Sequence, residues 1–220
     1  MLTMDRFPVI STKEQLKSLV SDIGFLPFFS CGIPGFCLRD TVDSSVWFVR
    51  DVEGPWEWKT DVGIYGKLFR GKAVFMSPEW YGILACYRRD GYDYEGMFED
   101  GLLSRNALSV MESIGNESLI STVLRSRVQM ESSAFDKAIT ELQMKCFLLP
   151  SGFEYAIDKN GRPYGWGIAK YAPSDYVYGK LIADAESEYT PDTAKEMLIE
   201  HVMEVCPGVD IKKAERLIRG

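Results

Sequence analysis

The order of hydrophobic periods in residues 102–171 constrains the fold more than any other feature of the chain. Apolar residues recur at helical spacing in three successive segments, Leu102–Ile114, Glu117–Val128 and Ser132–Leu142. Segments with strand character follow at Gln143–Leu149, Phe153–Asp158 and Tyr164–Tyr171, with an Asn160-Gly161 turn before the last one. Three helices followed by a β-hairpin are the elements of a winged helix, a helix-turn-helix with an appended β-wing.

The flanking sections predict both helices and strands. Residues 12–23 have helical spacing behind a Thr/Ser start, Gly63–Ser77 reads as strand, tight turn and strand, and residues 174–219 are mainly helical. We therefore expect an α+β protein that combines a winged helix (three helices plus a β-wing) with an N-terminal mixed αβ section and C-terminal helices. The expected sections are residues 1–101, 102–172 and 173–220, packed as one compact unit.

Few residues are available for metal binding or histidine chemistry. His201 is the only histidine, and the five cysteines are scattered without paired spacing, so the sequence predicts no metal site and no cofactor. No run of about 18 apolar residues is present to span a membrane, and the first residues lack the apolar segment of an export signal. We expect a cytoplasmic protein with reduced thiols.

Charge is distributed unevenly around a net value of −7. Residues 102–172 are the least acidic section, with 8 Lys and Arg against 7 Asp and Glu. In a winged helix this section meets nucleic acid through a recognition helix, here Ser132–Leu142, and through the wing. The candidate nucleic-acid-binding residues are Arg125, Arg127, Ser133, Lys137, Thr140, Lys145, Lys159, Asn160 and Arg162. Double-stranded DNA is the expected partner, with a protein partner as the alternative.

A second group of residues interleaves aromatic and basic side chains, as in sites that stack a base and hold phosphates. The candidate pocket consists of Trp56, Trp58, Lys59, Tyr65 and Lys67, with Arg88 and Arg89 farther along and Glu57 as a possible acid or base. The alternative is structural, because strand alternation would place both tryptophans on one core-facing side and Glu57 opposite.

Several longer motifs resemble a known family. The runs IPGFCLRD, VWFVRDVEGPWEWK, YGKLFRGKAVFMSPEWY and FEYAIDKNGRPYGWGIAKY are similar to the small AlkZ-related proteins of bacteria, with GPWEWK and GRPYGWG as the most specific pieces. The resemblance covers roughly residues 24–180. It implies a distant relationship to the AlkZ/YcaQ DNA glycosylases, which are built from winged helices and excise alkylated or crosslinked bases.

The resemblance also implies where catalytic residues would lie. Those glycosylases carry a Gln-x-Asp or Gln-x-Gln motif that positions water, and the nearest equivalent here is Gln129-Met130-Glu131, with glutamate at the third position. Gln129, Glu131 and Glu57 are therefore the catalytic candidates. Because the motif is incomplete, we expect a nucleic-acid-associated or regulatory winged-helix protein rather than an efficient enzyme. A DNA glycosylase and a protein–protein interaction module remain the alternatives.

Overall fold

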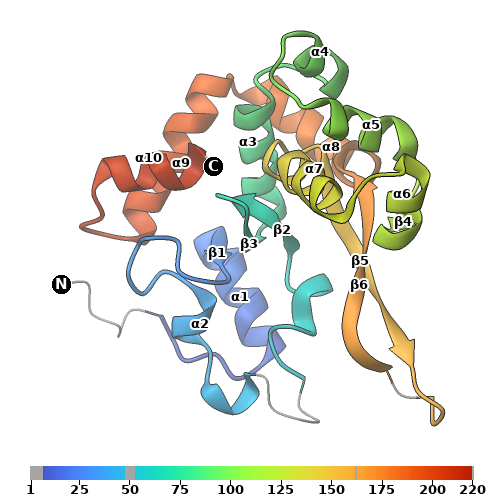
Figure 1. Ribbon diagram of the computed structural model, residues 1–220. Coiled ribbons are helices and arrows are strands. Elements are labelled where there is room, and N and C mark those ends of the chain that lie inside the picture. Colours follow the sequence, from blue (N-terminus) through green and yellow to red (C-terminus); the bar gives the residue numbers. More distant parts are fainter. Residues whose placement is uncertain (1–6, 48–52, 162, 220) are drawn as a thin grey trace.

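The computed structural model describes residues 7–47, 53–161 and 163–219, with backbone alone for residues 163–166. The helices are α1 (Lys13–Ile23), α2 (Leu38–Thr41), α3 (Pro78–Arg89), α4 (Tyr94–Glu99), α5 (Arg105–Ile114), α6 (Ser121–Val128), α7 (Ser132–Met144), α8 (Ser174–Glu188), α9 (Pro191–Val205) and α10 (Ile211–Arg219), with short 3₁₀ turns η2 (Ser44–Val46) and η3 (Trp58–Thr60). The strands are β1 (Phe25–Pro27), β2 (Ile64–Phe69), β3 (Lys72–Met76), β4 (Leu119–Ile120), β5 (Leu148–Ile157) and β6 (Pro163–Pro173). The fold is therefore mixed α+β (Figure 1).

The first small antiparallel sheet has the strand order β1-β3-β2. Strands β2 and β3 are joined by Arg70 and Gly71, whose φ angles of 53° and 68° are those of a tight hairpin turn. The strand, turn and strand predicted for Gly63–Ser77 are thus confirmed. Helix α3 follows, with Ser77 at its N-cap and Pro78 in its first turn, where the missing N–H of proline costs nothing.

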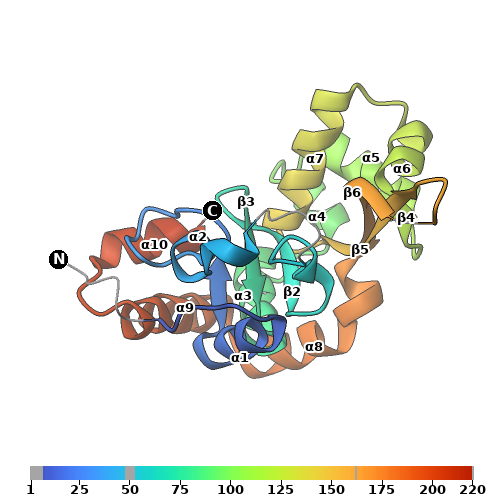
Figure 2. The same ribbon diagram turned by 90° about the horizontal axis from the view of Figure 1, so that it is seen from below.

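The N-terminal and C-terminal sections share one hydrophobic core. Phe25 in β1, Tyr81 in α3, Leu198 in α9 and Leu217 in α10 are all at most 1% exposed and belong to one cluster. The two ends of the chain therefore lie against the same α3 helix. Figure 2 shows α1, α9 and α10 grouped around α3, on the other side from α5, α6 and α7.

The middle of the chain has an apolar cluster of its own. Val110 of α5, Leu124 of α6 and Phe135 of α7 are buried together, and Phe147 and Leu148 extend the cluster to β5. The second antiparallel sheet, of order β4-β6-β5, lies beside these helices.

Two element boundaries in the middle section differ from the predicted ones. The segment expected as one helix from Glu117 begins with β4, because Leu119 and Ile120 pair with Tyr171 and Lys170 of β6. The strand expected from Gln143 begins only at Leu148, since α7 continues to Met144. Local periodicity does not reveal the pairing partner that decides each case.

One long antiparallel hairpin replaces the three short strands expected in residues 143–171. Leu148 pairs with Pro173 at its base and Ile157 with Pro163 near its tip, with register shifts between. At the tip, Asp158 Oδ1 accepts a hydrogen bond from Asn160 N at 2.7 Å, and Gly161 supplies the positive φ of the turn. The hairpin extends away from α5, α6 and α7 (Figure 1).

Across the described ranges, none of the helices combines the length and apolar character needed to cross a membrane.

Candidate nucleic-acid interface

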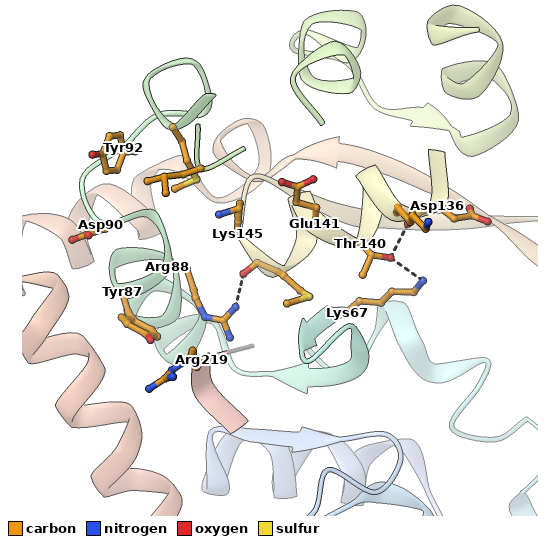
Figure 3. Close-up of a pocket in the computed structure, with 14 residues that line it drawn as sticks. Lys67, Tyr87, Arg88, Asp90, Tyr92, Asp136, Thr140, Glu141, Lys145 and Arg219 are labelled. Carbon is orange, nitrogen blue, oxygen red and sulfur yellow. Dashed lines mark hydrogen bonds between the residues drawn. The ribbon is translucent and has the colours of Figure 1, made fainter. Parts of the chain in front are cut away.

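A cavity of about 750 Å³ lies where α7 faces the C-terminal ends of α3 and α10 (Figure 3). We call it the basic cleft. Its lining residues are Lys67, Tyr87, Arg88, Asp90, Tyr92, Met97, Leu102, Asp136, Lys137, Thr140, Glu141, Met144, Lys145 and Arg219. Five of these are cationic and three are acidic, in a chain of net charge −7. The local excess of positive charge favours an anionic ligand.

Arg88 forms part of the cleft wall and is held by backbone oxygens. Its Nη1 donates to the Met144 carbonyl at 2.7 Å and its Nε to the Ile218 carbonyl at 2.8 Å, while Nη2 reaches Ile218 and, at 3.4 Å, Leu68. Within the described residues, Arg88 has no carboxylate partner. Burial lowers the pKa of Arg88, but a guanidinium stays charged in proteins. The cleft therefore has a fixed positive charge that forms no ion pair with an acid of the described residues.

Two lysines of α7 and its C-cap add to this charge. Lys145 is half-buried, and burial lowers its pKa; Arg88 acts in the same direction and Glu141 opposes it. Glu141 is already engaged, because its two carboxylate oxygens accept from Ser104 N at 2.9 Å and Ser104 Oγ at 2.5 Å. Lys137 is exposed on the same helix. In the described part of the chain neither lysine forms a salt bridge, so both are available to an anion.

One side of the cleft is fixed by contacts between α7 and β2. The Lys67 backbone N–H donates to Gln143 Oε1 at 2.8 Å, and Lys67 Nζ donates to Thr140 Oγ1 at 3.2 Å. Gln143 is only 1% exposed, and its amide also donates to the Ile139 carbonyl. These bonds dock the C-terminal half of α7 on the first sheet and give the cleft a rigid wall.

Two tyrosines provide aromatic surface at the opposite side of the cleft. Tyr87 is half-buried at the end of α3, and Tyr92 follows in the next loop, where its hydroxyl donates to Asp100 Oδ2 at 2.7 Å. Aromatic rings beside lysines and arginines are the composition of sites that stack unpaired bases and hold their phosphates.

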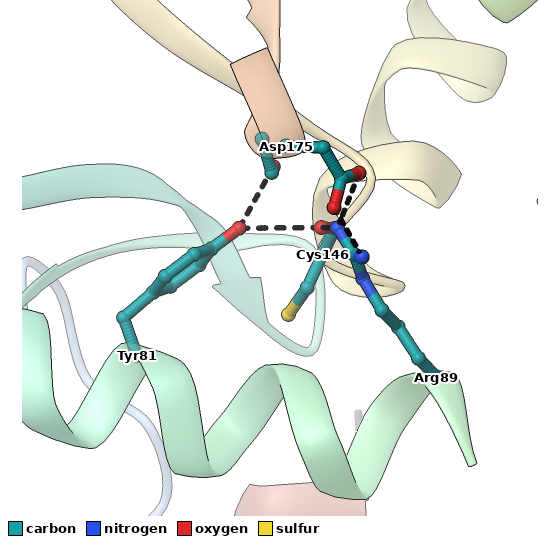
Figure 4. Close-up of polar contacts among 5 residues, drawn as sticks. Tyr81, Arg89, Cys146 and Asp175 are labelled. Carbon is teal, nitrogen blue, oxygen red and sulfur yellow. Dashed lines mark hydrogen bonds and ion pairs between the residues drawn. The ribbon is translucent and has the colours of Figure 1, made fainter. Parts of the chain in front are cut away.

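A second polar cluster, called here the Arg89 clamp, lies beside the cleft (Figure 4). Arg89 forms a bidentate pair with Asp175 at 2.8 and 3.0 Å and donates to the Cys146 carbonyl at 2.7 Å. Tyr81 donates to the same carbonyl at 3.3 Å and to Ser174 Oγ at 2.8 Å. The clamp ties α3 and α8 to the turn between α7 and β5.

A family model described as AlkZ related matches residues 10–219, which is nearly the whole chain. The chain belongs to the AlkZ-related family. No curated protein and no solved structure matches it. The resemblance inferred from the GPWEWK and GRPYGWG motifs is confirmed at the level of the family.

The AlkZ-related chain places its three catalytic candidates outside the basic cleft. Gln129 is exposed at the left-handed C-cap of α6, and Glu131 is the N-cap of α7, where its carboxylate accepts from Ser133 N at 3.2 Å. The Glu57 side chain is exposed, and its carboxylate accepts from the buried Gly54 N at 2.9 Å. The observed role of Glu131 and Glu57 is to satisfy nearby backbone N–H groups.

The predicted nucleic-acid-binding residues fall into two groups. Lys137, Thr140 and Lys145 line the basic cleft. Arg125 and Arg127 are exposed on α6.

Among the described residues, the predicted nucleic-acid-binding residues that lie outside the cleft are exposed, and two of them have local partners. Arg125 donates to Ser132 Oγ at 3.0 Å, and Arg127 pairs with Glu117 at 3.1 Å. Ser133 is exposed at the start of α7, and Lys159 and Asn160 are exposed at the hairpin tip. Arg162 lies outside the described residues. The cleft group and the α6–hairpin group thus form separate surfaces.

The predicted aromatic pocket is divided in the structure. Residues 55–60 form turns that include η3 rather than a strand, so strand alternation does not explain the positions of the tryptophans. Trp58 is 5% exposed in the first core, and Trp56 is half-buried. Lys59 and Tyr65 line a separate small cavity, whereas Lys67 lines the basic cleft.

Four lining residues of the cleft had no place among the predicted site residues although their chemistry matters: Tyr87, Tyr92, Glu141 and Arg219. A fifth, Arg88, was predicted only as a member of the aromatic and basic group, together with Arg89. Among residues 7–47, 53–161 and 163–219, no group of three or more His, Cys, Asp or Glu side chains is placed to hold a metal ion.

Proposed function

We propose that this AlkZ-related protein binds nucleic acid and holds an unpaired nucleotide or strand end in the basic cleft. The observation that carries the proposal is Arg88, a guanidinium fixed in the cleft wall by backbone carbonyls and without a carboxylate partner in the described chain. A phosphate supplies the missing negative charge and accepts from guanidinium and ammonium groups. Lys137 and Lys145 stand on the same wall as further phosphate ligands.

We further propose that the section predicted as residues 102–172 is a winged helix. The order α5, β4, α6, α7, β5, β6, with strand order β4-β6-β5, supports this assignment. In this proposal α6 and α7 are the helix-turn-helix, and the β5–β6 hairpin is the wing. The separate apolar cluster of this section is consistent with it.

The dimensions of the cleft favour an unpaired strand over a duplex. A volume of about 750 Å³ is that of a site for a compact ligand rather than for a double helix. In addition, Thr140 is bonded to Lys67, so the C-terminal half of α7 faces the protein and is not free to enter a major groove. Duplex DNA on the outer face of α6 and the hairpin stays a prediction from the sequence.

The test is fluorescence anisotropy at low salt with three labelled DNAs of one sequence: a single strand, a duplex and a duplex with a short unpaired bulge. We expect the single strand and the bulged duplex to bind more tightly than the perfect duplex, with affinity falling as salt rises. We expect Lys145→Ala to weaken the binding of both the single strand and the bulged duplex. Lys17→Ala, which replaces an exposed residue of α1, is the matched control. Equal affinity in wild type and Lys145→Ala, or no binding at low salt, refutes the proposal.

A further inference from the structure

Among the described residues, Lys59 is a lysine that is almost completely buried. It is 3% exposed, and its Nζ lies 4.4 Å from the centroid of the Trp56 ring and 4.0 Å from that of the Phe153 ring. Within the part of the chain that the structure describes, the amine has no hydrogen bond or ion pair. A strongly hydrated ammonium is therefore enclosed by two aromatic faces, which replace only part of the water that it loses.

This enclosure favours the neutral amine. Burial lowers the pKa of Lys59 to about 8, and only Glu57 opposes the shift. The Glu57 side chain, however, is exposed and is bonded to Gly54 N. An appreciable fraction of Lys59 is thus unprotonated near neutral pH, and an unprotonated amine is a nucleophile.

Lys59 lines a cavity of about 90 Å³. Hydroxyl-bearing residues Tyr65, Ser151 and Tyr178 line it together with Lys59 and the Phe153 ring, and its lining contains no carboxylate. A volume of this size accommodates roughly three waters, or one end of a small organic molecule. The cavity is therefore a small recess lined by hydroxyl groups and by Lys59.

We propose that Lys59 is a reactive amine that condenses with an aldehyde to form an imine in this recess. The nitrogen lone pair adds to the carbonyl carbon to give a carbinolamine. A C=N bond then replaces the C–O bond, and the carbonyl oxygen leaves as water with the two amine hydrogens. The reaction needs no oxidant, reductant or further reactant, and water reverses it.

The position of the recess allows two sources of the aldehyde. Tyr65 lines the recess and Lys67 lines the basic cleft, two residues further along β2. Their Cα atoms are separated by about 7 Å along a strand, so the two cavities lie close to each other on the same edge of the first sheet. The aldehyde is therefore either a free small molecule or the ring-opened sugar of an abasic site in bound DNA. The second source rests on the proposed function, and the first does not.

The experiment is reductive trapping followed by peptide mass mapping. Purified protein is incubated with cyanoborohydride and either propanal or an oligonucleotide that carries one abasic site. We expect at least about tenfold more adduct at Lys59 than at the exposed Lys17 at pH 7.5, since the unprotonated fraction of Lys59 is the larger one. Trapping at Lys59 should reach half its maximum near pH 8.

Two variants separate reactivity from a structural role. Lys59→Arg keeps a cation between the rings but cannot form the imine, so the adduct disappears while the thermal unfolding midpoint changes little. Lys17→Arg is the matched control and leaves the Lys59 adduct unchanged. Adduct spread evenly over the exposed lysines, with both aldehydes, overturns the proposal. That result leaves DNA binding through the basic cleft intact, because anisotropy measures it independently. Trapping with abasic DNA alone, or with propanal alone, identifies the source.

Discussion

Arg88 and Arg89 are consecutive residues of α3, but the regions that they enter balance a buried charge in different ways. In the Arg89 clamp the guanidinium side chain is 6% exposed and pairs with Asp175, which is 55% exposed. In the basic cleft, the hydrogen bonds of Arg88 to the described residues all go to backbone carbonyl oxygens. A carbonyl fixes the orientation of a guanidinium but does not cancel its charge. The comparison therefore supports a structural role for the first region and the proposed ligand binding for the second.

The largest expected effect is on the clamp. Arg89→Met removes the donor of the bidentate pair and one of the two donors to the Cys146 carbonyl. We expect the free energy of unfolding to fall by about 3 kcal/mol, the lower end of the range for broken buried pairs, because Asp175 regains water. Urea denaturation measures this loss. DNA affinity of the folded variant should change by less than about twofold, a change within surface-mutation scatter; a large loss of affinity at full stability contradicts the division of roles.

Lys59 extends the comparison to a buried cation that has neither a carboxylate nor a carbonyl partner among residues 7–47, 53–161 and 163–219. Its pKa of about 8 lies below that of an unfolded lysine, so the unfolded chain holds more protons between the two values. The contribution of Lys59 to the free energy of unfolding is therefore lowest below pH 8 and increases as the pH rises toward 10. The unfolding free energy of wild type relative to Lys59→Met should rise by roughly 2 kcal/mol over this window.

Chemical denaturation of both proteins from pH 7 to 10 measures the difference. Subtracting the Lys59→Met curve removes the titration of tyrosines and cysteines that the two proteins share. A difference that is constant with pH shows that Lys59 keeps its proton in the folded protein.

The third prediction concerns the cleft itself. Arg88→Lys retains a positive charge but loses the planar set of donors that holds three carbonyls. We expect about tenfold weaker binding of single-stranded DNA, equivalent to one good charge-assisted contact of about 1.4 kcal/mol. Anisotropy titration measures it, and circular dichroism verifies the fold. Unchanged affinity means that Arg88 serves only to join α3 to α7 and α10.

The contrast between the two arginines also explains how much of the structure could be predicted from the sequence. Helical and strand periods located α1, α3, α5, α7 and the β2–β3 hairpin, since each depends on neighbours within a few residues. The difference between Arg88 and Arg89 does not depend on near neighbours. Arg89 pairs with Asp175, 86 positions away, and Arg88 bonds to Ile218, 130 positions away. An Arg-Arg pair at a helix end looks the same in both roles. Only the packing of α8 and α10 on α3 decides which arginine meets a carboxylate.

The same reason accounts for the candidate sites. Lys137 and Thr140 were selected because they share the polar face of the predicted recognition helix, and that local property is seen in the cleft. Lys145 was selected as a residue of a wing strand, but it lies at the C-cap of α7, because the helix continues to Met144. Lys59 and Lys67 were grouped because they are close in sequence, yet β2 presents Lys67 to α7 while Lys59 turns toward Phe153. Gln143, almost fully buried, lay at a predicted strand start, and its bond to Lys67 depends on a contact that no local pattern encodes.

The smallest expected effect separates the cleft from the outer surface of the middle section. Lys145 is in the cleft, next to Arg88, whereas Arg125 on α6 and Lys159 at the hairpin tip are exposed elsewhere. If a single strand occupies the cleft, Lys145→Ala should weaken its binding by about fivefold and reduce the slope of affinity against salt by about one phosphate contact. Arg125→Ala and Lys159→Ala should each change the binding of the single strand by less than about twofold, since neither residue lines the cleft and solvent and salt screen exposed charges. With a perfect duplex the order should reverse if α6 and the hairpin carry that contact. Titration of the single strand and the perfect duplex at three salt concentrations measures these effects. Equal effects of all three substitutions on both DNAs would mean that binding is diffuse and that the cleft has no special role.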